Sequence, residues 1–190
     1  MFDLSWRFDS WFNALPRSPK ERGSVHSLVL RTGTGVRASP DEVELVAGGG
    51  VVGDVWRTHA HSEPGNEVSL MNVHVLRAVC EGDESRMALA GDNLIVDLDL
   101  SEANLPTGTR LEIGTAVIAI SALPHRPCKK FVGRFGAMAA KRVARANRMG
   151  RRGRGVLCTI EKSGRVSRGD GIVVMRAGEN APRSVDGHRG

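Results

Sequence analysis

One cysteine of this chain stands among residues that could make it reactive. Cys128 lies in the segment 123–135, LPHRPCKKFVGRF, where four basic residues surround it. A β-prone run at 111–122 precedes it and is closed by Pro124, which predicts that the thiol lies in a loop. Positive neighbours favour the thiolate, which is both a nucleophile and a ligand for soft metals. The alternative is a small apolar residue in a loop that happens to be basic. The basic neighbours are His125, Arg126, Lys129 and Lys130.

The positive charge of the chain is concentrated in the part that contains Cys128. The 190 residues carry a net charge of +6. Residues 1–124 hold 10 Lys and Arg against 17 Asp and Glu, whereas residues 125–190 hold 17 against 4. This asymmetry predicts an anionic ligand or partner, such as nucleic acid, a phosphorylated cofactor or a small anion. Nucleic acid is the least favoured, because Phe131 and Phe135 are the only aromatic residues of the basic part that could stack on bases.

Composition and cysteine usage indicate a soluble protein of a reducing compartment. Hydrophobic residues make up 41% and charged residues 25%, which is typical of globular domains. Cys80, Cys128 and Cys158 are odd in number and widely spaced, which favours neither a disulfide framework nor a zinc ribbon. We find no signal peptide and no apolar stretch near the roughly 20 residues that a membrane span needs. We therefore expect a cytoplasmic protein without membrane contact.

The chain divides into three segments of different character. Residues 1–22 hold apolar residues at roughly helical spacing, which predicts a short amphipathic helix packed on the body. Residues 23–176 form the main domain, and residues 177–190 are polar and predicted to be disordered. The apolar residues of the first segment are Trp6, Phe8, Trp11, Phe12 and Leu15.

The main domain reads as several short strands and two helices. Residues 24–31 alternate and predict the first strand, whereas residues 73–80 predict a short helix that buries Cys80. Cys158 alternates with apolar neighbours, which predicts the core side of a late strand. The clearest helix is expected at about 134–149, with an apolar face. That face consists of Phe135, Ala139, Val143 and Ala146.

Four basic residues also recur at helical spacing along this predicted helix. Lys141, Arg145, Arg148 and Arg152 would align on one stripe if the helix continued to residue 152. The stripe is either a solvated helix face or a cradle for an anion near Cys128.

Three histidines are weaker candidates for a metal site. His59 and His61 are spaced as alternating residues of a strand, and His74 follows them. Such a pair could chelate zinc, but the third ligand is unidentified, and exposed or hydrogen-bonding histidines are commoner.

Several short motifs, taken in order, resemble the MOSC domain family, named for the C-terminal module of molybdenum cofactor sulfurases. They span about residues 24–176, and the resemblance implies a mostly-β α+β fold, a barrel-like domain with a few flanking helices. The motifs are GVVGD (50–54), EVSL (67–70), GDNL (91–94), PTG (106–108), LEIG (111–114), RPC (126–128), RRGRG (151–155) and GD (169–170).

The resemblance also implies a role for the loop cysteine, which is Cys128 in this chain. In this family that cysteine is regarded as a molybdenum ligand or a sulfur carrier, so we expect Cys128 to be both catalytic and metal-binding. The pterin of the molybdenum cofactor carries a phosphate that basic residues could hold. By charge, its candidate contacts are Arg126, Lys129, Arg151 and Arg152, and the motif matches Asp54 and Asn93 could line the pocket.

Two features differ from the pattern of the family. The strand that contains Glu67 follows Asn66, where a basic residue would be expected. These 190 residues contain no pyridoxal-phosphate sulfurase domain before the module, so we do not expect them to bind pyridoxal phosphate.

Three functions remain open on these grounds. The first is a molybdenum-dependent oxidoreductase that reduces N-hydroxylated compounds and takes electrons from an external protein, because no flavin, haem or iron–sulfur ligand set is visible. The second is a sulfur carrier or transferase that uses a Cys128 persulfide and a sulfur-donor protein. The third is an anion-binding or nucleic-acid-binding module.

Overall fold

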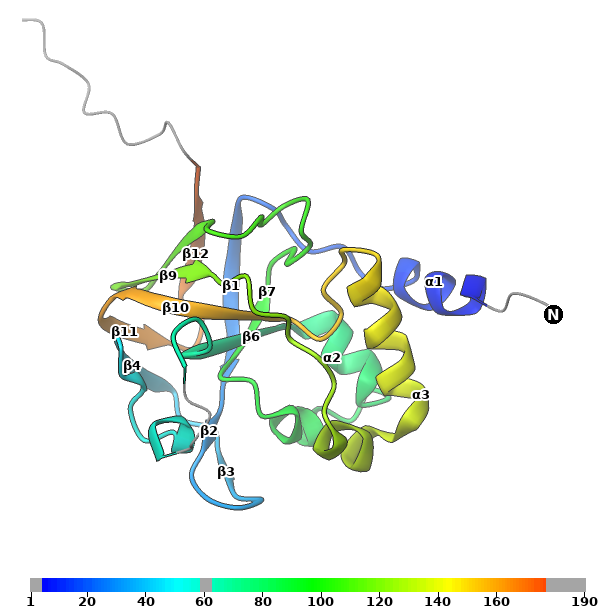
Figure 1. The fold of residues 1–190 in the computed structure, drawn as a ribbon, viewed down its shortest axis with the longest axis horizontal. Coiled ribbons are helices and arrows are strands. Elements are labelled where there is room, and N and C mark those ends of the chain that lie inside the picture. The colour runs from blue at the N-terminus through cyan, green and yellow to red at the C-terminus, as the bar shows by residue number, and fades with distance from the viewer. Residues whose placement is uncertain (1–4, 59–62, 177–190) are drawn as a thin grey trace, which may run out of the picture.

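Seven strands of the chain close into a β-barrel (Figure 1). The computed structural model describes residues 5–58 and 63–176. Neighbouring strands are antiparallel except for one parallel pair, which confirms the barrel-like, mostly-β α+β fold expected from the sequence. Around the barrel the order is β1 (Arg22–Leu28), β12 (Gly171–Met175), β8 (Arg110–Ile113), β9 (Ala116–Ile120), β10 (Val156–Lys162), β6 (Val68–Asn72) and β7 (Leu94–Asp97), which pairs with β1.

The barrel interior is apolar because inward positions of its strands alternate with outward ones. On β8, Leu111 and Ile113 are buried while Arg110 and Glu112 are exposed. Cys158 occupies an inward position of β10 and belongs to the same core, as predicted.

Short strands extend one end of the barrel. The expected first strand at 24–31 is divided in the structure, because β1 pairs with β7 only as far as Leu28 and the next residues pair elsewhere. The resulting hairpin joins β2 (Leu30–Arg31) to β3 (Arg37–Ala38). The other small sheet contains β4 (Glu42–Val46), β5 (Gly50–Val51) and β11 (Gly164–Ser167), and the 3₁₀ helix η1 (Val55–Thr58) follows β5.

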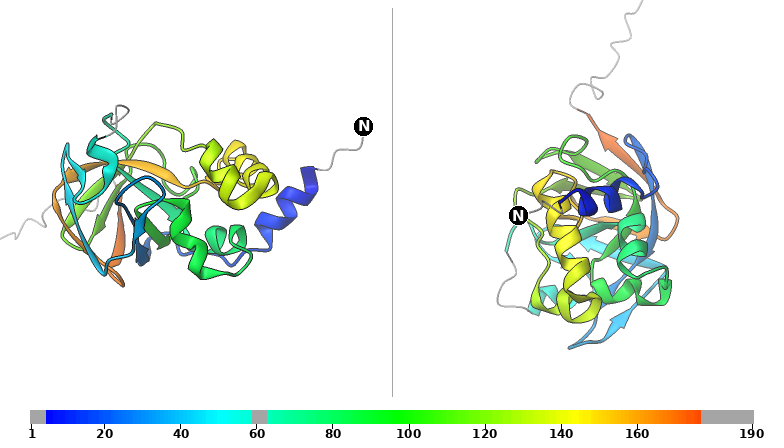
Figure 2. Two further views of the ribbon diagram at one scale, coloured as in Figure 1. Left: turned by 90° about the horizontal axis from the view of Figure 1, so that it is seen from below. Right: turned by 90° about the vertical axis from the view of Figure 1, so that its right-hand side faces the viewer.

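All the described helices except η1 gather on one side of the barrel (Figure 2). They are α1 (Ser5–Asn13), α2 (Val73–Val79), the 3₁₀ helix η2 (Glu84–Ala90) and α3 (Lys129–Arg148). Asp9 of α1 pairs with Arg145 of α3 at 3.1 Å, and Trp11 and Phe12 pack on the helical cluster. The side chains of Trp6 and Phe8 lie outside the described residues. None of the described helices is long and apolar enough to cross a membrane.

Helix α3 begins earlier than the sequence predicted and ends within one residue of the predicted end. It starts at Lys129 rather than near Arg134, and a single non-helical residue, Gly136 (φ 84°, ψ 163°), interrupts it. The segment before the break is held by Phe131, which is only 2% exposed, an isolated anchor that the periodicity did not show. Cys128 is therefore the residue at which the loop ends and the helix begins.

The predicted apolar face of this helix is confirmed, but the basic stripe is divided. Ala139, Val143 and Ala146 are buried. Because α3 ends at Arg148, Arg152 lies outside it and adopts a positive φ of 48°.

Candidate functional site

The three cysteines differ sharply in their access to solvent. Cys80 and Cys158 are buried, and burial raises the pKa of Cys80 to about 11 and that of Cys158 to about 12. Both are therefore protonated structural thiols, as predicted. Cys128 is exposed. It is the one cysteine of this chain that can reach a ligand from solvent.

The helix that follows Cys128 is anchored on a buried ion pair. The ring of Phe131 lies 5.0 Å from the guanidinium of Arg154, close enough for a cation–π contact. Arg154 donates from Nη1 to Oδ2 of Asp92 at 2.6 Å, and from Nη2 to the Ala90 carbonyl at 3.3 Å. Arg154 and Asp92 are both buried. The position of the thiol thus depends on side chains that come from distant parts of the sequence.

The loop before Cys128 rests on the same ion pair. Nε2 of His125 lies 3.6 Å from Oδ1 of Asp92. Burial, assisted by the charges of Arg154 and Arg31, lowers the pKa of His125 well below its ordinary 6.5, so the ring is neutral at physiological pH. Burial raises the pKa of Asp92, and Arg154 opposes this rise. On the other side of the loop, Nδ2 of Asn147 donates to the His125 carbonyl at 2.7 Å.

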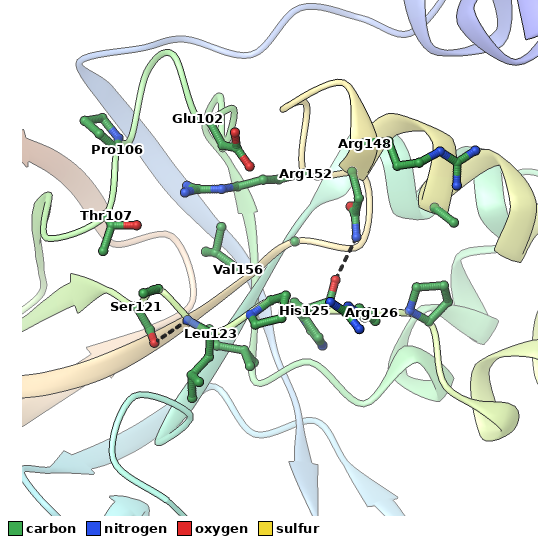
Figure 3. Close-up of a pocket in the computed structure, with 17 residues that line it drawn as sticks. Glu102, Pro106, Thr107, Ser121, Leu123, His125, Arg126, Arg148, Arg152 and Val156 are labelled. Atoms are coloured by element: carbon green, nitrogen blue, oxygen red, sulfur yellow. Dashed lines mark hydrogen bonds between the residues drawn. The ribbon is translucent and has the colours of Figure 1, made fainter.

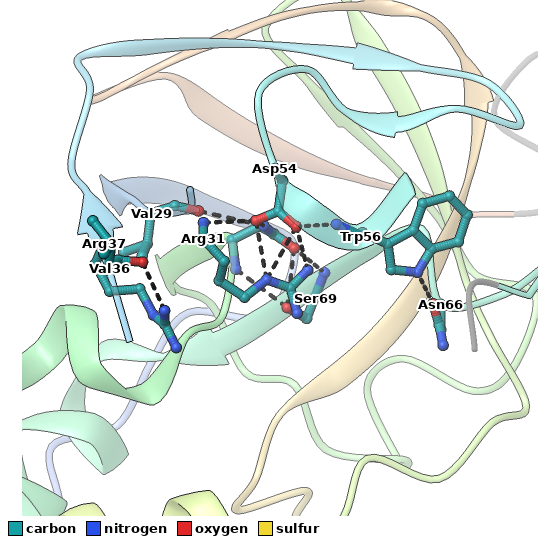
Figure 4. Close-up of polar contacts among 9 residues, drawn as sticks. Val29, Arg31, Val36, Arg37, Asp54, Trp56, Asn66 and Ser69 are labelled. Carbon is teal, nitrogen blue, oxygen red and sulfur yellow. Dashed lines mark hydrogen bonds and ion pairs between the residues drawn. The ribbon is translucent and has the colours of Figure 1, made fainter. Parts of the chain in front are cut away.

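A second buried network orients Arg31 (Figure 4). Asp54 accepts hydrogen bonds from the Arg31 backbone N–H at 2.8 Å and from its Nη2 at 2.6 Å. Trp56 N–H and Asn93 Nδ2 also donate to this carboxylate, at 2.9 and 3.1 Å. Burial would raise the pKa of Asp54, but the hydrogen bonds and charge of Arg31 outweigh it and lower the pKa. Asn93 further bonds Ser69 and the Val29 carbonyl.

Arg31 and Arg37 lie beside Gly91, and Arg134 lies near enough to Arg37 for its charge to act on that guanidinium. A Cβ at this glycine, whose φ is +78°, would lie 3.4 Å from Nη2 of Arg37 and 3.7 Å from Cδ of Arg31. Burial, followed by the charges of Arg134 and Arg31, lowers the pKa of Arg37. Arg134 belongs to the first segment of α3 and donates to the Leu89 carbonyl at 2.7 Å. Crowding of like charges in a partly buried place favours an anion among them.

Arg37 retains an unused donor within this cluster. Its Nε is buried and has no hydrogen-bond partner among the described residues. Arg31 uses Nε and Nη2 on Asp54, so its Nη1 is likewise without a partner in the described part of the chain. Arg31, Arg37 and Arg134 together form the arginine cluster.

A pocket of about 790 Å³ lies on another face of the loop (Figure 3). Its lining includes residues of the loop 121–127, the last turns of α3 and the segment 102–107. Arg126 and Arg152, two of the predicted cofactor contacts, both line it, whereas Cys128 does not. Arg152 donates from Nη1 to the Leu105 carbonyl at 2.6 Å, which fixes its guanidinium across the pocket.

The predicted site residues are thus separated into groups. Lys129 is exposed beside Cys128 at the start of α3. Arg151 faces away from both groups, because it donates to Asn13 at 2.6 Å and lies over the ring of Phe12. Asp54 and Asn93 share one network, in which they hold Arg31; contact of either side chain with a ligand stays a prediction.

The predicted histidine site is described only in part. His59 and His61 lie outside the described residues. His74 lies 3.3 Å from Asp97, and the described residues contain no group of three side chains arranged to hold a metal ion.

Sequence reasoning missed the residues that support the thiol. Asp92 and Arg154 lie inside two of the motifs, but the sequence pointed to Asn93, Arg151 and Arg152 instead. Burial of a charged pair leaves no local signal in the sequence. Arg31 and Arg37 face each other across the β2–β3 hairpin, whereas Arg134 is distant in the sequence, so no local pattern places it beside them. A basic residue at the end of a predicted strand was the only available sign of Arg31.

Comparison with known proteins identifies a family for this chain. The sequence profile of the MOSC domain matches residues 57–173, which cover both the parallel strand pair and the Cys128 loop. No curated protein matches the chain.

Solved structures share the fold at low sequence identity. YuaD from Bacillus subtilis aligns with a TM-score of 0.61 and 19% identity, over 80% of this chain and 95% of that protein. YiiM from Geobacillus stearothermophilus aligns with a TM-score of 0.57 and 14% identity, over 83% and 77%. YiiM from Escherichia coli gives 0.53 and 22%, over 85% and 70%.

Proposed function

Because this chain belongs to the MOSC domain family, we propose that it binds the molybdenum cofactor with the Cys128 thiolate as the metal ligand. The observation that carries the proposal is the exposure of Cys128 at the start of α3, while Cys80 and Cys158 are buried and protonated. A metal ligand must be accessible and deprotonated, and only Cys128 among the three meets the first condition.

The arginine cluster fits the anionic end of the same cofactor. A phosphate prefers guanidinium groups that can offer two N–H donors each. Arg37 and Arg31 both retain donors that have no partner in the described part of the chain. Arg134 connects the cluster to the first segment of α3, which begins directly after Cys128. We therefore assign the phosphate to the arginine cluster, and the thiolate ligand to Cys128.

The reaction we propose is reduction of an N-hydroxylated compound. An N–OH group takes two electrons and two protons to give N–H and water, and the electrons come from an external electron-transfer protein. Bound molybdenum would supply the two-electron oxygen-atom chemistry. The protein binds the metal through Cys128, neutralises the phosphate with the arginine cluster, and fixes the loop through the neutral ring of His125.

Molybdenum and pterin content tests the binding step. Protein purified gently from cells that make the cofactor is compared with the variants Cys128→Ala and Cys80→Ala. We expect stoichiometric molybdenum in the wild type and in Cys80→Ala, and loss of metal in Cys128→Ala with an unchanged circular dichroism spectrum. Full metal content in Cys128→Ala would refute the ligand assignment.

A double variant tests the phosphate assignment separately. Arg37→Gln with Arg134→Gln should lower pterin content while the thiol of Cys128 still reacts with a thiol reagent. The matched control is Arg168→Gln, which removes an exposed guanidinium from the turn between β11 and β12. Unchanged pterin content in the double variant would remove the arginine cluster from the proposal.

The exposure of Cys128 also favours a second function, that of a sulfur carrier. A persulfide sulfur must be presented to another protein, and an exposed residue between a loop and a helix is suited to that transfer. Cyanide-releasable sulfur on wild-type protein, lost in Cys128→Ala and present without molybdenum, would support the carrier. Absence of such sulfur from metal-loaded, active protein would exclude it.

A further inference from the structure

We propose that the pocket beside the loop 121–127 is a second ligand site, which binds a small organic anion independently of Cys128. The volume of about 790 Å³ lies within the usual range of ligand pockets, about 300–1,000 Å³. This inference does not rest on the proposed cofactor function, because Cys128, Asp54 and the arginine cluster do not line the pocket.

The pocket combines an apolar surface with an excess of positive charge, as ligand sites commonly do. Its charged lining residues are three arginines and one carboxylate, Glu102. The apolar lining comes from the loop, α3 and the start of β10. It consists of Pro106, Ala122, Leu123, Pro124, Ala144 and Val156, among others.

Two of the three arginines are available to a ligand. Arg152 is fixed on the Leu105 carbonyl. Arg126 and Arg148 are exposed, and neither makes a hydrogen bond or ion pair with the described residues. They come from different elements of the pocket wall, the loop and the last turn of α3. Paired guanidiniums bind carboxylate and phosphate through several charge-assisted hydrogen bonds.

The pocket is also polar at its other end. Figure 3 shows Arg126 and Arg148 toward α3, with Thr107 and Ser121 at the opposite end. The Ser121 hydroxyl accepts a hydrogen bond from the Leu123 backbone at 3.0 Å and retains its own proton for donation. A ligand with an anionic group, a flat apolar ring and a polar substituent at the far end matches this order of groups.

Hydrogen bonds join the elements that line the pocket, so its shape is preformed. Asn147 donates to the His125 carbonyl at 2.7 Å and accepts from the Arg154 backbone N–H at 3.0 Å. It thereby connects α3 to the loop and to the turn before β10. A preformed pocket loses little entropy when a ligand binds.

Calorimetric titration of the purified protein tests the site with two anionic probes. The phosphate probe is adenosine 5′-monophosphate, with adenosine as its neutral partner, and the carboxylate probe is 4-aminobenzoate, with 4-aminobenzamide as its neutral partner. We expect at least one anion to bind with a Kd of about 1 mM or tighter and its neutral partner to bind at least tenfold more weakly. Failure of both anions at that level, or equal binding of the neutral partners, would overturn the proposal.

Variants then locate the bound anion. Arg148→Gln and Arg126→Gln should each raise the Kd about tenfold, because each removes a charge-assisted contact. Arg168→Gln, which changes an exposed arginine outside the pocket, should leave the Kd unchanged. An unchanged Kd in both pocket variants would overturn the assignment.

Cys128→Ala separates this site from the proposed cofactor site. We expect the alanine variant to bind the anion with the wild-type Kd, whether or not it has lost molybdenum. Loss of anion binding in Cys128→Ala would show that the anion occupies the thiol site and would refute a second site.

Discussion

Arginines on two faces of the loop 121–128 have opposite surroundings. Arg154 is buried against Asp92, and its guanidinium also packs on Phe131. Arg126 and Arg148 lie at an open pocket without a partner among the described residues. The same side chain therefore serves structure on one face and is available to a ligand on the other. Burial and pairing decide between these roles, and both are properties of the fold rather than of the residue type.

The largest expected change in stability comes from replacing arginine by glutamine on the buried face of the loop rather than at the pocket. Arg154→Gln leaves the Asp92 carboxylate buried without its cation, which should lower the free energy of unfolding by about 3–5 kcal/mol. Chemical denaturation measures the change. Combining Arg154→Gln with Asp92→Asn should restore part of the loss, because the unpaired charge is removed. A single variant as stable as the wild type would contradict the structural role of Arg154.

The network around Asp54 should show a smaller loss of stability, again at a buried charged residue and not at an exposed one. Asp54→Asn removes charge-assisted hydrogen bonds to Arg31, so we expect a loss of about 1.5–3 kcal/mol in unfolding free energy. Asp41→Asn, at an exposed position, is the matched control and should leave stability nearly unchanged. Equal effects of the two substitutions would show that the Asp54 network does not stabilise the fold.

The sequence predicted the elements whose residues have a regular spacing and missed the features that depend on contacts between distant residues. Alternation identified the strands at 24–31 and around Cys158, and the spacing of Ala139, Val143 and Ala146 identified the apolar face of α3. The start of α3 was misplaced because Phe131 is its only large buried residue before Gly136, and one residue has no periodicity.

The candidate site was predictable only where a motif marked it. Cys128 was found from its basic neighbours, and its exposure agrees with the expected loop end. The pairing of Asp92 with Arg154 joins residues that are 62 positions apart, so no local pattern could indicate it. For the same reason, the charge of Arg126 and Arg152 could not show that they line a pocket apart from the thiol.

The stability of the protein should also depend on pH, because His125 lies on the buried face of the loop. The native state keeps His125 neutral, because burial and the nearby Arg154 and Arg31 lower its pKa well below 6.5. The unfolded state takes up a proton as the pH falls through 6.5, so stability should decrease below that pH by at most about 1.4 kcal/mol for each pH unit. Denaturation at a series of pH values measures this slope.

Two variants resolve the source of the acid response. His125→Gln should flatten the slope between neutral pH and the onset of carboxylate titration. His26→Gln is the matched control: burial and Arg77 lower the pKa of His26 as well, but its ring is less buried, so its removal should change the slope less. A slope that persists in His125→Gln would show that His125 does not cause it.

The smallest change in stability is expected from the two exposed arginines of the pocket. Arg148→Gln and Arg126→Gln remove exposed guanidiniums that make no hydrogen bond or ion pair with the described residues, so unfolding free energy should change by less than about 0.5 kcal/mol. If either variant lost as much stability as Arg154→Gln, that arginine would be part of the structural framework. Stability close to that of the wild type, together with weaker anion binding, would instead show that this face of the loop keeps its arginines for a ligand.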